Sequence, residues 1–159
     1  MNKITKALVK IFDEDQKLIR KFSAGLIARK EITKKTKSNK ETLISILKII
    51  DFPIIKYTNK KAYKASILIT LHSGDIGFME KFLDKLRKQN SKEIDKGDIG
   101  YLVDKINVLK GLSQVYGTQY IKNKKEIKFL PILDEKNLDK RRKELGMENW
   151  EEYEKKIIS

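Results

Sequence analysis

The stretch GLSQVYGTQ, from Gly111 to Gln119, lies where the hydrophobic pattern of the chain changes its period. Before it, residues 98–110 carry apolar side chains at helical spacing, and Gly111 stands where a glycine favours the end of a helix. After it, residues 119–122 and 126–130 alternate between apolar and polar types, with Asn123-Lys124 between them. This alternation predicts a short β-hairpin. The quoted stretch therefore joins a helix to a hairpin.

Helical periodicity covers most of the rest of the chain. The predicted helices span residues 3–30, 38–50, 59–72, 75–89, 98–110, 137–145 and 149–157. Four of them begin at a residue whose side chain can cap the first turn, namely Ser38, Asp75, Asn137 and Asn149. We therefore predict a mainly α fold: a single domain over residues 1–159, with about six to seven helices and one small β-hairpin near residues 119–130.

One basic segment interrupts this pattern. Residues 31–38 are polar and basic, and we expect them to form a flexible loop. The sequence Ser38-Asn-Lys-Glu41 matches a capping box, in which the serine caps backbone amides and the glutamate three residues later reaches back. We therefore place the start of the second helix at Ser38.

Length and composition narrow the class of protein. The chain has 159 residues, enough for one domain with its own core. It contains no cysteine, which excludes disulfides and cysteine-based zinc sites and fits a reducing compartment. Its basic start lacks the apolar core of a signal peptide, and the longest apolar run, near residues 65–71, is too short to span a membrane. We expect a soluble, cytoplasmic protein with no membrane partner.

The formal net charge is +14, and it is concentrated near the start of the chain. The first 40 residues contain 12 basic and 4 acidic side chains, a difference of +8. Two interpretations remain open. The lysines reflect a composition rich in Lys, Ile and Asn, as an AT-rich genome gives, or they form a true anion-binding face. Only five of the 36 basic residues are arginine, the side chain that binds carboxylate or phosphate with two parallel hydrogen bonds.

Two polar groups in the first half of the chain are candidate site residues. Gln16 and Arg20 share one helix face, and Asp15 lies beside them, so the three suit the mouth of a pocket. His72 is the only histidine and ends an apolar helix, where an acid–base role is chemically suitable. The simpler interpretations are a solvated helix face for the first group and a structural or capping histidine for the second.

The second half of the chain offers three more candidates. Asp104-Lys105 lies in the middle of a helix. The stretch that follows offers hydrogen-bond donors and acceptors on Gln114, Tyr116, Thr118 and Gln119, and Gly117 permits a close backbone approach. Arg141 and Arg142 suit an anion clamp or a buried network with Asp139, Asp15 or Asp104. For this whole set, a polar cluster that fixes the hairpin onto the helices is the alternative.

Together these stretches resemble a widespread bacterial family of unknown function. The matching positions are Asp15-Gln16 with Arg20, Leu71-His72, Asp104-Lys105, Gly111 to Gln119, and Leu138 to Gly146 with Arg141-Arg142. Leu71 and Lys105 depart from the family pattern, which has Gln and Arg there. The resemblance implies either one shared polar site or one structural polar network. The site would be lined by Asp15, Gln16, Arg20, His72, Asp104, Gln114, Tyr116, Thr118, Gln119 and Arg142.

Three functions are consistent with these residues. In an enzyme, His72 would be the general acid–base, oriented by Asp104 or Asp15, with Tyr116 donating hydrogen bonds and the arginines holding a small anionic or peptide-like substrate. A binding module would use the same pocket without chemistry. Nucleic-acid binding would use the lysine-rich surface. The sequence contains no phosphate loop, dinucleotide fingerprint, zinc motif or nucleophile elbow, so the cofactor stays unknown and no metal ligand is assigned.

Overall fold

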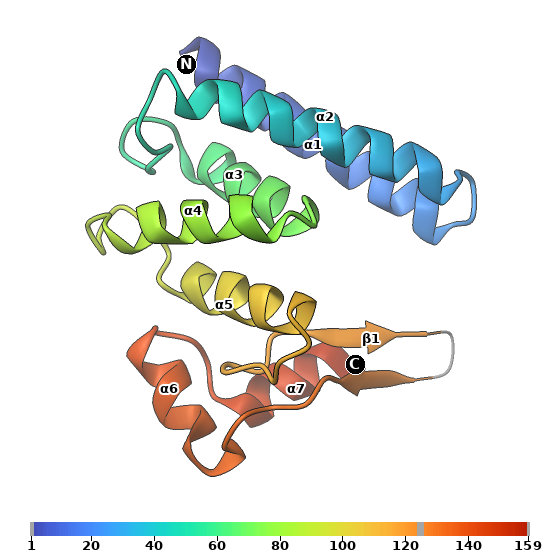
Figure 1. The fold of residues 1–159 in the computed structure, drawn as a ribbon, viewed down its shortest axis with the longest axis vertical. Helices are drawn as coiled ribbons and strands as arrows, with labels where there is room; N and C mark the ends of the chain where they lie inside the picture. Colours follow the sequence, from blue (N-terminus) through green and yellow to red (C-terminus); the bar gives the residue numbers. More distant parts are fainter. Residues whose placement is uncertain (1, 124–125, 159) are drawn as a thin grey trace. The chain divides into compact units, whose positions relative to one another are not determined.

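The computed structural model describes residues 2–123 and 126–158 of the chain. In these residues the fold is mainly α, as predicted, with seven α-helices, one 3₁₀ helix and one antiparallel hairpin (Figure 1). The helices are α1 (Lys3–Ser23), α2 (Arg29–Leu47), α3 (Lys60–His72), α4 (Ile76–Arg87), α5 (Gly97–Leu109), α6 (Leu138–Glu144) and α7 (Trp150–Ile158). The other elements are β1 (Tyr120–Lys122), β2 (Ile127–Phe129) and η1 (Glu135–Asn137). No helix in these ranges is long and apolar enough to cross a membrane.

The hairpin lies within the predicted residues 119–130. Its register pairs Tyr120 with Phe129, Ile121 with Lys128 and Lys122 with Ile127. The turn predicted at Asn123-Lys124 falls partly outside the described residues, because Lys124 is not among them.

The described residues form two compact units. Unit 1 contains residues 2–78 and 88–94, and unit 2 contains residues 79–87 and 95–158. Helices α1, α2 and α3 belong to unit 1, whereas α5, the hairpin, α6 and α7 belong to unit 2, and the division falls within α4. The expectation of a single domain stays a prediction.

In unit 1, α3 packs against both α1 and α2. Helix α3 buries residues on nearly every side because its sequence is almost uniformly apolar or small between Ala62 and Thr70. Helix α1 buries a single stripe of residues at helical spacing: Thr5, Leu8, Ile11 and Asp15. The carboxylate of Asp15 thus continues the apolar stripe by which α1 faces its neighbours.

The predicted loop at residues 31–38 is wrong, because these residues lie inside α2. The turn between the first two helices comes earlier, where Gly25 adopts a positive φ of 71° and the Leu26 amide donates to the Lys21 carbonyl. Glu31, rather than Glu41, reaches back to the Ala28 amide at the start of α2. The basic segment therefore forms regular turns of α2. A run of charged residues does not by itself interrupt the backbone hydrogen bonds of a helix.

In unit 2, α7 packs against the hairpin through aromatic rings. The centroids of Phe129 and Trp150 lie 4.6 Å apart, and those of Trp150 and Tyr153 lie 6.0 Å apart. The side chain of Asn149 caps α7 by accepting from the Glu152 amide at 2.9 Å, as predicted. Asn137, by contrast, makes no side-chain cap to α6.

The carboxylate of Asp75 caps α4, also as predicted. Its Oδ1 accepts from the Phe78 amide at 2.9 Å, and its Oδ2 lies 3.0 Å from the ammonium of Lys40. These two hydrogen bonds lower the pKa of Asp75. The stability that they supply is therefore present above the ordinary pKa of aspartate and is lost as the pH falls through the lowered value.

We predict that Asp75→Ala lowers the free energy of unfolding by about 1 kcal/mol at neutral pH, because the cap of α4 is lost. Urea unfolding of the two proteins at neutral pH and in acid measures this difference. The difference should shrink in acid, where the carboxyl of the wild-type protein is protonated. A difference that is the same at both pH values would contradict the assignment.

Candidate functional site

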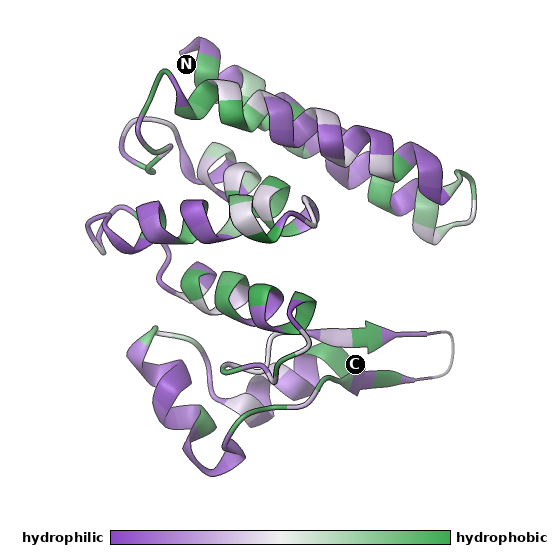
Figure 2. Ribbon diagram, viewed as in Figure 1, coloured by the Kyte–Doolittle hydropathy of each residue, from purple (hydrophilic) through white to green (hydrophobic). Residues whose placement is uncertain are grey.

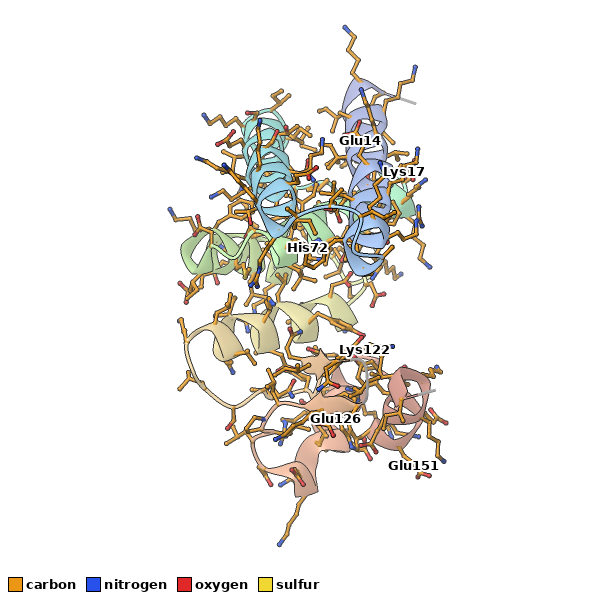
Figure 3. The ribbon with its side chains drawn as sticks, turned by 90° about the vertical axis from the view of Figure 1, so that its right-hand side faces the viewer. Glu14, Lys17, His72, Lys122, Glu126 and Glu151 are labelled. Atoms are coloured by element: carbon orange, nitrogen blue, oxygen red, sulfur yellow. The ribbon has the colours of Figure 1, made fainter. Side chains whose placement is uncertain are left out.

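In unit 1 the structure brings together two of the predicted residues, Asp15 of α1 and His72 at the end of α3. Figure 3 labels His72. Oδ2 of Asp15 lies 3.2 Å from Nδ1 of His72. The Asp15 side chain is 6% exposed and the His72 side chain is 33% exposed. A buried carboxylate therefore holds an imidazole that water can reach.

This contact fixes which ring nitrogen of His72 is available. A carboxylate accepts hydrogen bonds, so Nδ1 carries the hydrogen and the lone pair of the neutral ring is on Nε2. No hydrogen bond to Nε2 is formed by residues in the described ranges. Of the two carboxylates that we expected to orient His72, Asp15 belongs to the same unit and contacts the ring.

The other predicted residues of α1 lie at its surface. Gln16 is half-buried, and Arg20 is exposed with its guanidinium in no ion pair within residues 2–123 and 126–158. Arg20 lies five residues beyond Asp15, or about 7.5 Å further along the helix axis. Five residues also turn about 140° around the helix axis, so exposed Arg20 lies on a different face of α1 from buried Asp15.

In unit 2, Asp104 of α5 is fully buried and holds the loop that follows the helix. Its Oδ1 accepts from the amides of Val115 at 2.6 Å and Tyr116 at 2.9 Å. Its Oδ2 accepts from the amide of Thr118 at 2.9 Å and from the Thr118 hydroxyl at 3.0 Å. Both carboxylate oxygens are therefore occupied by the GLSQVYGTQ stretch itself.

Gln114 performs a similar task between that loop and the hairpin. Its side chain is fully buried, its Nε2 donates to the carbonyls of Gln119 and Leu130, and its Oε1 accepts from the Gln119 amide at 2.7 Å. Its backbone pairs with the segment after the hairpin at Ile132. Gln114 therefore joins three passages of the chain and has little capacity left for a ligand.

The two arginines of α6 bind backbone carbonyl groups of the same loop. Arg141 Nε donates to the Val115 carbonyl at 2.9 Å, and Arg142 Nη1 donates to the Tyr116 carbonyl at 2.6 Å. Arg142 is 1% exposed, its guanidinium lies 4.6 Å from the centroid of the Tyr153 ring, and its Nη2 has no partner among the described residues. Within the described part of unit 2, neither arginine pairs with Asp139 or Asp104; Nη1 of Arg141 instead lies 3.6 Å from Oδ2 of Asp134. The pairing with Asp15 stays a prediction.

Two predicted residues of this loop keep polar groups without partners. The hydroxyl of Tyr116 makes no hydrogen bond within the described residues, and burial together with the charge of Asp104 raises the pKa of Tyr116. The amide nitrogen of Gln119 donates to the Thr118 hydroxyl at 3.1 Å, whereas its side-chain oxygen has no such partner in the described ranges. These are the groups of the loop that remain available.

Sequence reasoning missed the residues that close the space around the loop. A Cβ added to Gly100 would lie 3.0 Å from the sulfur of Met147 and 3.3 Å from the Tyr116 ring. A Cβ on Gly117 would lie 2.5 Å from the Trp150 ring. The signal for Gly100 was its place four residues before Asp104, on one helix face. For Trp150 there was no local signal, because its contact depends on the fold.

The predicted residues thus fall into two groups, one in each unit. Asp15, Gln16, Arg20 and His72 belong to unit 1, and Asp104, Gln114, Tyr116, Gly117, Thr118, Gln119, Arg141 and Arg142 belong to unit 2. Among the described residues no group of three or more His, Cys, Asp or Glu side chains is placed to hold a metal ion.

These features define a mainly helical protein with a polar network around one loop and an aspartate–histidine pair. The family of unknown function DUF6624 matches residues 23–158, and the chain belongs to that family. The match includes His72 and all the unit 2 residues of the network, whereas Asp15, Gln16 and Arg20 precede it. No curated protein and no solved structure matches the chain.

We predict that Asp104→Asn lowers the free energy of unfolding by roughly 3 kcal/mol, because an amide group cannot accept every hydrogen bond that the carboxylate accepts. Fluorescence of Trp150, the only tryptophan, reports unfolding of unit 2 in urea. Asp84→Asn, at an exposed position of α4, is the control and should change little. Equal stability of the two variants would show that Asp104 does not anchor the loop.

Two glycines of the quoted stretch form a matched pair for a second prediction. Gly111 and Gly117 have nearly the same φ, 74° and 73°, but an added Cβ meets nothing within 4 Å at Gly111 and meets the Trp150 ring at Gly117. Gly111→Ala should cost about 1 kcal/mol for the backbone alone. Gly117→Ala should cost about 2 kcal/mol more, because the ring must move. Equal losses in urea unfolding would rule out a tight contact with Trp150.

Proposed function

We propose that unit 1 carries an acid–base site in which Asp15 orients His72, and that the chain uses this site on a small anionic or peptide-like ligand. The observation that carries the proposal is the contact of 3.2 Å between a buried carboxylate and a partly exposed imidazole. Buried carboxylates that orient a histidine at the surface of a site are a common arrangement for proton transfer.

The chemistry follows from the position of the lone pair. Nε2 of His72 accepts a proton from a water molecule or a hydroxyl group as its oxygen attacks a carbonyl or phosphoryl centre. The imidazolium that forms is stabilised by the negative charge of Asp15, and it returns the proton to the leaving group.

Arg20 and Gln16 are the groups that we assign to ligand binding. The exposed guanidinium of Arg20 suits a carboxylate or phosphate oxygen, and the Gln16 amide both donates and accepts. An anionic ligand is favoured because Arg20 has no carboxylate partner in the described residues. A neutral ligand would leave that charge unused.

The unit 2 residues have a different role in this proposal. Asp104, Gln114, Thr118, Arg141 and Arg142 direct nearly all their polar atoms to the backbone of the chain itself. We therefore assign them to a structural frame rather than to catalysis. The hydroxyl of Tyr116 and the side-chain oxygen of Gln119 are the remaining candidates for ligand contacts in unit 2.

We predict that the neutral ring of His72 carries its hydrogen on Nδ1 and that Asp15→Ala removes this preference. Because His72 is the only histidine, its ring nitrogen signals in a ¹⁵N nuclear magnetic resonance spectrum need no assignment. Asp13→Ala is the matched control, since Asp13 lies on the same helix and pairs with Lys61 instead. A ring that keeps one tautomer in both variants would show that Asp15 does not orient it.

Catalysis is tested with a panel of p-nitrophenyl esters, p-nitrophenyl phosphate and aminoacyl p-nitroanilides. We expect His72→Ala to lower turnover at least about a hundredfold and Asp15→Ala to lower it less, with Asp13→Ala as wild type. Turnover that survives His72→Ala intact would end the catalytic assignment. A ligand that shifts the His72 signals and is recovered unchanged would assign the site to binding without chemistry.

A further inference from the structure

Helices α1 and α2 form an antiparallel pair joined by a short turn, which we call the α1–α2 hairpin. The end of this hairpin that contains the turn has no hydrophobic core. The buried residues of α1 all precede residue 16, and those of α2 all follow residue 38. Between them, residues 16–38 contain no buried side chain. The two helices lie side by side up to this turn (Figure 1), so this half of the helical hairpin is a two-helix projection.

Apolar side chains are nevertheless present at this end. Phe22 is 42% exposed and Leu26 is 73% exposed, whereas Leu8 and Leu43, nearer the other end, are fully buried. Figure 2 shows hydrophobic stretches of ribbon at the turn between α1 and α2, among hydrophilic ones. Phe22, near the end of α1, and Leu26, in the turn that follows, are four residues apart, so two exposed apolar side chains lie close together in the sequence at this end.

The same end carries a dense positive charge. Residues 17–37 contain eight basic side chains and one acidic side chain. Seven of the eight are exposed and form no ion pair within the described residues: Lys17, Arg20, Lys21, Arg29, Lys30, Lys34 and Lys37. The eighth, Lys35, pairs with Glu14. Lys17 and Glu14 are labelled in Figure 3.

The positive charge and the exposed apolar side chains of residues 17–37 together favour one class of partner over two others. A second copy of this surface would bring seven unpaired cations against seven others, which repel. A nucleic acid would use the cations but leave Phe22 and Leu26 in water. A bilayer with anionic lipids accommodates both, because cations bind at the level of the phosphates while apolar side chains enter the boundary with the acyl chains.

We propose that the turn end of the α1–α2 hairpin, residues 17–37, binds the surface of membranes that contain anionic phospholipids. Phe22 and Leu26 insert at the headgroup level, and the surrounding lysines and arginines contact the lipid phosphates. This contact requires no spanning segment, and it is independent of the acid–base proposal because it uses neither Asp15 nor His72. Arg20 is shared between the two proposals, so it is left unchanged in the tests.

The experiment is co-sedimentation of the full chain with vesicles of phosphatidylcholine alone and with vesicles that also contain phosphatidylglycerol. At about 0.15 M salt, where screening acts over about 8 Å, we expect at least tenfold tighter binding to the anionic vesicles. Replacing Lys21, Arg29 and Lys30 with glutamine should weaken this binding by about fivefold for each charge removed. Equal binding to both kinds of vesicle, or no binding to either, would overturn the proposal.

The double variant Phe22→Ser with Leu26→Ser measures the apolar contribution to vesicle binding separately from the contribution of charge. This double variant keeps every charge and changes only exposed positions, and we expect it to lose at least tenfold in vesicle affinity. The matched control is Ile49→Ser with Tyr57→Ser, which are 74% and 64% exposed and lie outside residues 17–37; it should bind as the wild type. Circular dichroism of both variants confirms that they are folded.

Two further outcomes would overturn the proposal. If the Phe22 and Leu26 variant binds anionic vesicles as tightly as the wild type, the contact is charge adhesion without insertion. If a DNA duplex is bound while vesicles are not, and the double variant retains that DNA binding, the surface belongs to nucleic acid. Measurements of mass in solution before vesicles are added show whether the variants change self-association, and a loss of self-association in the double variant would point to a second copy.

Discussion

The carboxylate of Asp104 is the interaction on which unit 2 depends. It is fully buried, yet no lysine or arginine lies against it within the described residues; its charge is met by three amides and one hydroxyl of the loop. The carbonyls of the first two of those residues, Val115 and Tyr116, point instead to Arg141 and Arg142. The peptide group that joins Val115 to Tyr116 therefore lies between the Asp104 carboxylate, which accepts from its amide, and the Arg141 guanidinium, which donates to its carbonyl. Arg142 is buried with no carboxylate partner among the described residues because it donates to the carbonyls of Tyr116 and Glu148 and lies against the Tyr153 ring.

Two of the three buried aspartates among the described residues, Asp15 and Asp104, illustrate two uses of one side chain. Asp104 accepts four hydrogen bonds and leaves no oxygen for another group, so it fixes a loop. Asp15 instead contacts His72, a side chain that reaches the surface, and in the proposed function it orients that ring. Carboxylates that are fully satisfied by backbone stabilise a fold, whereas those that hold a second titratable side chain prepare it for proton transfer.

The sequence carried enough information for the class of fold and for most of the elements. Helical spacing placed α3, α5 and the hairpin closely, and the caps at Asn59, Asp75 and Asn149 follow from local hydrogen bonds that need no knowledge of the rest of the fold. The boundary between the first two helices was predicted wrongly. Charged residues such as those at 31–38 do not break a helix, whereas Gly25, with its positive φ, follows the end of α1. Contacts between polar residues are more difficult to predict from sequence than helices are. Asp104 and Val115 lie eleven positions apart, and their hydrogen bond depends on the conformation of a turn that the spacing of residues does not define.

The family match covers the polar residues of unit 2 completely and those of unit 1 only in part. The frame of Asp104, Gln114, Arg141 and Arg142 lies wholly inside residues 23–158, so this loop arrangement is a property to be sought throughout the family. The Asp15–His72 pair has one member inside the match and one before it. The same is true of the turn end of the α1–α2 hairpin, where residues 17–22 precede the match and residues 23–37 lie within it. The proposed acid–base site and the proposed membrane-binding end therefore both include residues of α1 that the family match does not cover. Two members that share the frame can differ in both proposed functions if their first helices differ.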